Sequence, residues 1–284
     1  MPVDPNAPVV TQSQIAAGLR SLGLAAGESI MVHSSLSALG NVQGGANAVI
    51  DAVLEVIGPK GTVVFPTFTG VAIELIGKPI TDLKGYTGIV PATARGRGDF
   101  ISGKHPLYSI TAKGPLAQKW VDMEDKYIFP SAQKKWLYDM GQVGGKTLLL
   151  GCDHGGNSSI HVAAELARLE YKIQDIQWWD MTTEEFLKLP RQRQKEMMDA
   201  HMGFKLPYRL DKHMNSIEWP LVEAKAIRIG IIGQAECRIM KIADLVRVGV
   251  EALKKNPWLL ADRLAKPEGW EKLKPPADPA MSKH

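Results

Sequence analysis

Residues 144–171, GGKTLLLGCDHGGNSSIHVAAELARLEY, carry the clearest structural pattern in the chain. Lys146 to Leu150 is a short apolar run that stops at Gly151, which is typical of a buried strand. A polar loop rich in glycine follows, and Ser158 to Tyr171 then has the apolar spacing of an amphipathic helix. The stretch therefore predicts a strand, a loop and a helix in succession.

The same alternation extends toward the N-terminus. Glu28–His33 and Thr62–Phe65 predict two more buried strands. Thr11 to Gly23, opening with a capping-box pattern, predicts a helix before the first of them, and Ala46 to Ile57 predicts a helix between them. Strands that alternate with helices indicate an α/β protein with a mainly parallel sheet.

Composition excludes several classes of protein. The chain has 284 residues, of which 45% are hydrophobic, so it can bury a large core and is not disordered. The net charge of +4 is mild, and no basic stripe interleaved with aromatic residues points to nucleic acid. Two cysteines, the absence of an apolar span of about 20 residues and the lack of a signal peptide predict a cytoplasmic protein without a membrane partner.

Polar segments follow all three predicted strands. They are residues 33–37 (HSSLS), residues 66–69 (PTFT) and residues 151–161 (GCDHGGNSSIH). Ligands of open α/β sheets bind at the carboxyl ends of the strands. We therefore expect these three segments to form one shared site.

His161 and Glu165 are the leading candidates for chemistry in that site. They lie four residues apart on the predicted helix, so they share one face. A carboxylate beside an imidazole can orient it and raise its basicity, which suits a general base. An ordinary exposed pair of side chains has the same spacing. Either Asn157 or Ser158 is expected to cap the helix.

Other candidates rest on weaker patterns. His154, His161 and Glu165 could together hold zinc in a metal-dependent hydrolase. Cys152 could act as a nucleophile with a neighbouring histidine, although a small buried thiol is the commoner case. A lone histidine at the end of a strand, such as His33, is more often structural than catalytic.

Six segments of the chain resemble one known family in order and content. They are VHSSLSALG (32–40), GPKGTVVFPTFT (58–69), GIVP (88–91), HPLYSITAKGP (105–115), GGKTLLLGCDHGGNSSIHVAAELA (144–167) and GQAECRIM (233–240). The sequence resembles the aminoglycoside 3-N-acetyltransferase family over roughly residues 10–255. This resemblance implies a three-layer α/β/α sandwich, distinct from the fold of the commoner acetyltransferase superfamily.

The resemblance also implies an activity and a set of site residues. Members of the family transfer the acetyl group of acetyl-CoA directly to an amine, and no metal is expected. His161 would be the catalytic base with Glu165 close by, and His33 and His105 would line the same cleft. The residues implied to contact acetyl-CoA are Ser34, Ser35, Leu36, Ser37 and Ser109.

The expected acceptor is the 3-amino group of a 2-deoxystreptamine aminoglycoside, as in a resistance enzyme. Another small amine or aminosugar is the alternative, and a catalytically silent CoA-binding protein is a third interpretation. We expect one domain over residues 1–264, with residues 172–220 as an acceptor-binding insertion and residues 265–284 as a tail rich in proline and lysine. The sequence does not indicate the oligomeric state.

Overall fold

The computed structural model describes residues 8–69, 85, 87–129, 135–168, 181–201, 208–209, 213–260 and 262–263. The predicted tail at 265–284 and residues 172–180, 202–207 and 210–212 of the predicted insertion lie outside these ranges. Within them, no helix is both long and apolar enough to cross a bilayer.

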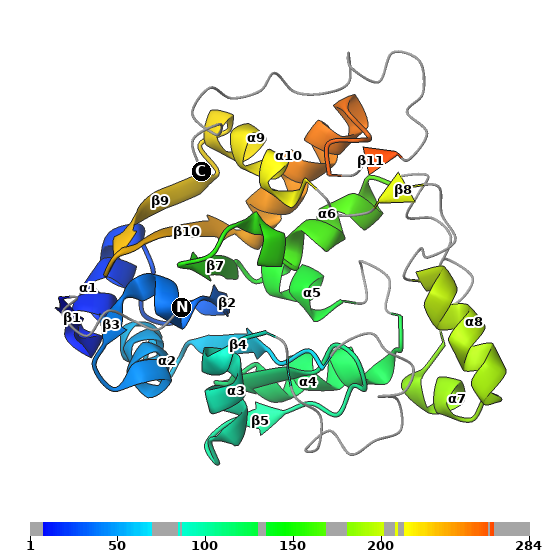
Figure 1. Cartoon of the computed structure of the whole chain (residues 1–284), viewed down its shortest axis with the longest axis horizontal. Helices are drawn as coiled ribbons and strands as arrows, with labels where there is room; N and C mark the ends of the chain where they lie inside the picture. Colours follow the sequence, from blue (N-terminus) through cyan, green and yellow to red (C-terminus); the bar gives the residue numbers. More distant parts are fainter. Residues whose placement is uncertain are drawn as a thin grey trace.

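A seven-stranded sheet organises the described part of the chain (Figure 1). Its strands, in spatial order, are β5 (Ile101–Ser102), β6 (Ile110–Lys113), β4 (Thr62–Pro66), β2 (Ser29–Ser34), β7 (Lys146–Leu150), β10 (Ala235–Lys241) and β9 (Ile227–Ile232). The described residues also form two small sheets, which pair β1 (Val9–Val10) with β3 (Asn41–Val42) and β8 (Tyr208–Arg209) with β11 (Asp262–Arg263).

The sheet is mixed, so the expectation of a mainly parallel sheet was wrong. Only β2 is parallel to its neighbours, β4 and β7, while every other pairing in this sheet is antiparallel. The three strands predicted from the sequence are β2, β4 and β7, which lie at the centre of the sheet. For the pair at one end of the sheet the reason is local: β9 and β10 are joined by the short turn at Gly233–Gln234, and so tight a turn can connect only antiparallel strands.

Helices cover both faces of the sheet, giving the three layers that were expected. On one face, α1 (Gln12–Leu22), α2 (Gly45–Ile57) and α3 (Ile89–Gly96) pack in one apolar cluster with inward residues of the central strands. Among the described residues, the helices on the opposite face are α4 (Ala117–Lys126), α5 (Trp136–Gln142), α6 (Ser159–Leu166), α9 (Glu218–Glu223) and α10 (Ile242–Lys255).

Alternation along β2 assigns its side chains to the two layers. Ile30 and Val32 are buried against α1 and α2, whereas Met31 belongs to the cluster around α4 and α5. Since successive side chains point to opposite faces of a sheet, His33 lies on the same face as Met31. That face also carries α6.

Local signals set the helix ends largely as expected. Thr11 and Gln14 form a reciprocal capping box at the start of α1, and Gly23 ends this helix in a left-handed conformation with φ +95°. Helix α6 is shorter than expected, because it ends at Leu166 and Arg168 has a positive φ of 54°.

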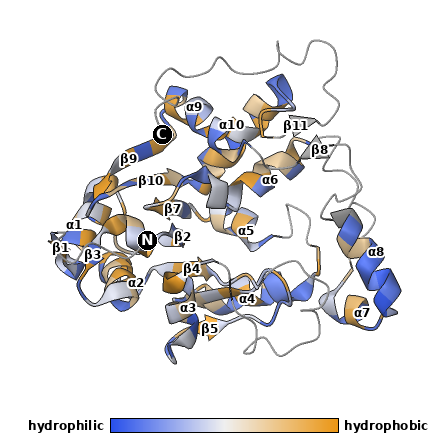
Figure 2. Cartoon of the chain, in the orientation of Figure 1, coloured by the Kyte–Doolittle hydropathy of each residue, from blue (hydrophilic) through white to orange (hydrophobic). Residues whose placement is uncertain are grey.

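Helices α7 (Thr183–Leu187) and α8 (Arg191–His201) lie beside the sheet rather than over it (Figure 1). Figure 2 shows that α8 is mostly hydrophilic. A separate apolar cluster joins Phe186, Met197 and Met198 of these helices to Leu107, Ile128 and Phe129.

The turn at Gly233 leads to a stability prediction. Gly233 has a φ of +61°, and an added Cβ would lie 2.4 Å from the carbonyl oxygen of Leu39. Gly45 has a similar φ of +58° but open space around the Cβ position. We expect Gly233→Ala to lower the free energy of unfolding by about 2–4 kcal/mol and Gly45→Ala by about 1 kcal/mol. Urea denaturation measures both, and equal losses would contradict the close contact.

Candidate active site

Three loops meet at one edge of the sheet, because β2, β4 and β7 run parallel and end there. The Ser35 amide donates to the Leu150 carbonyl at 2.9 Å, which joins the loops after β2 and β7. The Thr67 amide, after β4, donates to the Ser109 carbonyl at 2.8 Å. The parallel register of β2 with β4 and β7 thus brings the three strand ends to one edge, and the Ser158 amide, which donates to His33, joins the first and third polar segments; that all three form one shared site stays a prediction.

His33 is one of the buried histidines at this edge. Its side chain comes from β2, and its Nε2 accepts a hydrogen bond from the backbone amide of Ser158 at 3.3 Å. Burial, followed by repulsion from His161 and His154, lowers the pKa of His33 to about 3. The ring is therefore neutral and holds the segment that leads into α6.

His161 lies in the first turn of α6 and is only partly buried. Two bonds fix that turn: the Oδ1 of Asn157 accepts from the Ser159 amide at 3.1 Å, and the hydroxyls of Ser159 and Thr147 lie 2.6 Å apart. Of the two expected caps, Asn157 makes the bond, while Ser158 makes no side-chain capping bond. A partly open imidazole on a fixed helix start is a suitable proton acceptor.

Glu165 has a partner that sequence reasoning missed. Its Oε1 forms an ion pair with the Nζ of Lys135, and both side chains are largely buried. Lys135 also acts on Glu124. Burial raises the pKa of the Glu124 carboxyl to about 8, and the positive charge of Lys135 opposes this rise. No sequence spacing signals this cluster, because its members come from α4, α6 and the residue before α5. The expected role of Glu165, which is to assist His161, stays a prediction.

His105 is held within its own loop. Its Nδ1 accepts from the amides of Leu107 at 3.1 Å and Tyr108 at 2.9 Å, and its Nε2 faces the carbonyl of Tyr127 at 3.2 Å. This arrangement assigns the ring proton to Nε2. The contacts give the ring a structural role, and its expected catalytic role stays a prediction.

The loop after β2 has polar groups available for a ligand. The Ser34 hydroxyl is buried and has no hydrogen-bond partner among the described residues. The hydroxyls of Ser35 and Ser37 lie 3.5 Å apart, flanking Leu36, where the short helix η1 (Leu36–Leu39) begins. A buried hydroxyl without a partner at the end of β2, followed in the chain by two further serines, fits the polar part of a ligand.

Ser109 is placed differently from the other serines. It is fully buried, and its hydroxyl donates to the Gly103 carbonyl at 2.9 Å. The Thr67 hydroxyl in turn donates to the Ser109 carbonyl at 3.0 Å. These bonds tie the strand-end loops together, and the expected contact of Ser109 with a cofactor stays a prediction.

The alternative chemistries find little support in the geometry. Burial and the nearby carboxylate of Asp153 raise the pKa of the Cys152 thiol to about 12, so the thiolate form is disfavoured. Within the described ranges, no three His, Cys, Asp or Glu side chains come together in a group that could hold a metal ion.

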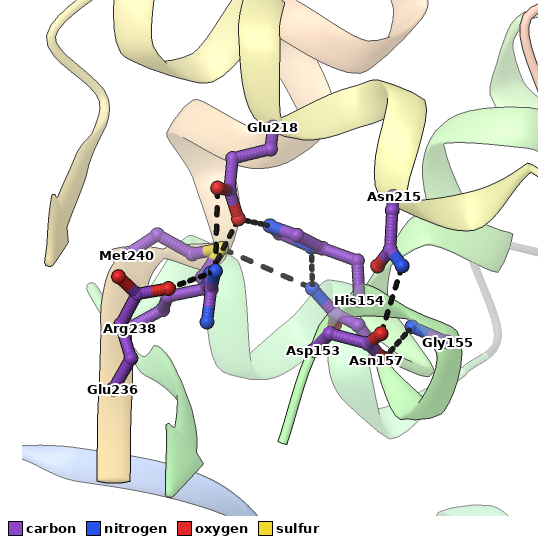
Figure 3. Close-up of polar contacts among 9 residues, drawn as sticks. All are labelled: Asp153, His154, Gly155, Asn157, Asn215, Glu218, Glu236, Arg238 and Met240. Carbon is purple, nitrogen blue, oxygen red and sulfur yellow. Dashed lines mark hydrogen bonds and ion pairs between the residues drawn. The ribbon is translucent and has the colours of Figure 1, made fainter. Parts of the chain in front are cut away.

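His154 faces a carboxylate from a distant part of the chain (Figure 3). Its Nε2 lies 3.4 Å from the Oε2 of Glu218, and Glu218 is also paired with Arg238. Burial raises the pKa of Glu218, but hydrogen bonds from His154 and Arg238 outweigh it and lower the pKa to about 2. Nothing in the sequence pattern pointed to Glu218, whereas Arg238 lies in the GQAECRIM segment.

Comparison with known proteins gives a consistent result. A family model described as aminoglycoside 3-N-acetyltransferase matches residues 31–75 and 78–254. Aminoglycoside N(3)-acetyltransferase III from a Salmonella species is 28% identical over 271 residues, covering 87% of this chain and 92% of that protein.

Solved structures show the same fold. A mutant of aminoglycoside acetyltransferase AAC(3)-IVa in complex with a gentamicin matches with a TM-score of 0.68 at 18% identity, covering 90% of this chain and 93% of that one. AAC-IIIb in a binary complex with CoASH matches with a TM-score of 0.66 at 19% identity, covering 87% of this chain and 97% of that one.

The burial of His33 predicts a dependence of stability on pH. Its pKa is lowered on folding from 6.5 to about 3, so its contribution is complete above pH 6.5 and is lost as the pH falls toward 3. The slope from this group reaches about 1.4 kcal/mol per pH unit. We expect the difference in unfolding free energy between pH 7 and pH 5, from urea denaturation, to shrink in His33→Gln, whose amide oxygen can still accept from Ser158. A His33 ring that titrates above pH 5 by NMR would contradict this.

Proposed function

The chain belongs to the aminoglycoside 3-N-acetyltransferase family, and on this premise we propose that it is an acetyl-CoA-dependent N-acetyltransferase with His161 as general base. The observation that carries the proposal is the placement of His161. It is a partly open imidazole on the first turn of α6, in electrostatic contact with the buried His33.

A base is needed because the acceptor amine is largely protonated at neutral pH. The amine must lose a proton before its lone pair can attack the carbonyl carbon of a thioester. Removal of that proton by a positioned imidazole contributes roughly 10²–10⁴ in rate. His33 is less suited to this step, because its Nε2 already accepts the Ser158 amide and its pKa is lowered to about 3.

The loop after β2 is the proposed contact for acetyl-CoA, whose thioester supplies the acetyl group. Its orphaned Ser34 hydroxyl, the paired hydroxyls of Ser35 and Ser37 and the backbone around Leu36 supply donors for polar groups of the ligand. The CoASH complex of the similar AAC-IIIb supports a CoA site in this fold. Ser109 contributes to this proposed acetyl-CoA site only indirectly, because its hydrogen bonds with Gly103 and Thr67 hold the neighbouring loops together.

For the acceptor, we propose the 3-amino group of a 2-deoxystreptamine aminoglycoside. Support comes from the family itself and from the gentamicin complex of AAC(3)-IVa. Another small amine or aminosugar is the alternative within the same reaction class. The acidic residues of α7 and α8 give the aminoglycoside no added support, because Glu184 pairs with Lys188 and Glu196 with Arg193 on the helix surface.

The experiment that tests the proposal is thiol release from acetyl-CoA in the presence of a panel of aminoglycosides, with simple amines and aminosugars as further acceptors. Release that depends on an aminoglycoside, with mass-spectrometric mapping of the acetyl group to the 3-amino nitrogen, is the expected result. Release only with other amines would select the alternative acceptor. Absence of release with every amine, in protein that binds acetyl-CoA, would contradict the proposed activity.

Removal of the base should separate catalysis from binding. We expect His161→Ala to lower kcat by about 10²–10⁴ while leaving the Kd for acetyl-CoA within about twofold. Steady-state kinetics and calorimetry measure the two quantities. Cys152→Ser is the matched control, since it lies in the same segment and should keep full activity. An unchanged kcat in His161→Ala, or a loss in Cys152→Ser, would contradict direct transfer with His161 as base.

A further inference from the structure

A buried ion pair joins the last turn of α6 to the start of α5. The Nζ of Lys135 contacts the Oε1 of Glu165, and the two side chains are only 20% and 14% exposed. Lys135 immediately precedes α5, and Glu165 lies in the last turn of α6. The two helices are neighbours on one face of the sheet (Figure 1), so the pair bridges them.

The lysine of this pair extends from a fixed backbone. The Lys135 carbonyl accepts hydrogen bonds from the amides of Tyr138 at 3.0 Å and Asp139 at 3.4 Å, as the N-cap of α5. Trp136, the next residue, is buried in the apolar cluster that also contains Val162 of α6. A cation on such a support can hold its partner carboxylate in one place.

The Glu165 carboxylate makes no second contact that would serve the imidazole. Its other oxygen, Oε2, is buried and has no hydrogen-bond partner among the described residues. A carboxylate that orients an imidazole accepts a hydrogen bond from a ring N–H group. Since Oε1 is engaged by Lys135 and Oε2 makes no bond, the contacts of Glu165 favour a different role.

The neighbouring acid, Glu124, shows what a buried carboxyl group becomes without a direct ion pair. Burial raises its pKa to about 8 although the charge of Lys135 opposes the rise, so it is mostly protonated at neutral pH. Lys135 forms its ion pair with Glu165 instead. Such a pair is costly to break, because removal of one partner leaves the other charge buried and uncompensated.

His161 lies between two polar contacts that fix a short helix. Helix α6 has eight residues, and a helix of this length has little stability of its own. Its start is fixed by the bond between the Asn157 side chain and the Ser159 amide, and its last turn by the ion pair of Glu165. Loss of the second contact would free the turn that follows the imidazole.

From these contacts we propose that Lys135 is a positioning residue: by pairing with Glu165, it fastens the last turn of α6 to the start of α5 and so keeps His161 in place. The claim that this matters for turnover rests on the proposed acetyltransferase function. The claim that the pair restrains α6 does not, and it can be tested without activity. A displacement of about 1 Å at a catalytic group can cost about 10² in rate, so a small movement of α6 is sufficient.

The variants that test the pair are Lys135→Met, Glu165→Gln, the double variant that combines them, and Lys135→Arg, which keeps a cation. Lys119→Met is the matched control. Lys119 pairs with Asp139 of α5 at 2.7 Å, so its loss removes a lysine from another ion pair of the same helical layer without touching α6. The measurements are kcat and its pH profile, KM for acetyl-CoA, and hydrogen exchange of backbone amides in full-length protein.

We expect Lys135→Met and Glu165→Gln each to lower kcat about tenfold, with KM for acetyl-CoA changed less than about twofold. The double variant should lose no more than either single variant, because all three break the same contact. Amides of α6 should exchange about tenfold faster in these variants, while those of α1 on the opposite face keep their rates. Lys135→Arg should stay within about threefold of wild-type kcat, and Lys119→Met should match wild type in kcat and in α6 exchange.

Lys135→Met also separates positioning from direct help to the imidazole. If Glu165 acted on His161 itself, freeing its carboxylate would maintain or raise kcat and would move the acidic limb of the kcat profile to higher pH. The proposal expects a lower kcat with that limb unmoved. The unpaired, buried Glu165 would take up a proton, as Glu124 does, and the net charge beside His161 would stay zero.

Several results would overturn the proposal. They are an unchanged kcat in Lys135→Met or in Glu165→Gln, losses that multiply in the double variant, an equal loss in Lys119→Met, and wild-type exchange of the α6 amides in both single variants. Lower stability with unchanged kcat in the folded protein would make the pair purely structural and would equally refute the positioning role.

Two further outcomes remain decisive. If wild-type protein releases no thiol with any amine, the proposed function fails, while the exchange comparison still decides whether the pair restrains α6. If Lys135→Met does not fold, Lys135→Gln replaces it. Its neutral amide can still donate to Glu165, so kcat should fall less, by about threefold, and an unchanged kcat there would contradict the proposal.

Discussion

The hydrogen bond from the Ser158 amide to Nε2 of His33 is the contact on which the arrangement of the site depends. It joins the end of the central strand β2 to the residue that precedes α6. The bond requires an unprotonated nitrogen, and burial beside two other histidines supplies it by lowering the pKa of His33 to about 3. The interior of the protein thus fixes a neutral ring, and that ring holds the helix that carries His161.

Three histidines in one region perform different tasks because their surroundings differ. His33 is a buried acceptor for a backbone amide, and His154 is a buried link between Glu218 and Asn157. His161 alone of the three is partly open to solvent, so it can exchange a proton with a bound molecule. A base of this kind needs a rigid support, and the two buried rings provide it from β2 and from the loop before α6.

Sequence patterns identified the central part of the fold and missed its edges. The three predicted strands became β2, β4 and β7, since short apolar runs that end in glycine, proline or polar residues are distinctive. The antiparallel flanks were not expected, because β5 has only two residues and the apolar run of β9 (IRIGII) carries no signal of strand direction. The extrapolation from the three parallel strands to the whole sheet therefore failed.

Sequence alone determined the family, the three strand-end loops and the position of His161 on a helix start, because each is encoded in a short contiguous motif. The tertiary structure decided the partners. Lys135 meets Glu165, and Glu218 meets His154, across 30 and 64 residues of chain. Pairing at such separations depends on how helices pack over the sheet, and no local spacing encodes it. The same packing buries His33 and sets its protonation state, which no motif could specify.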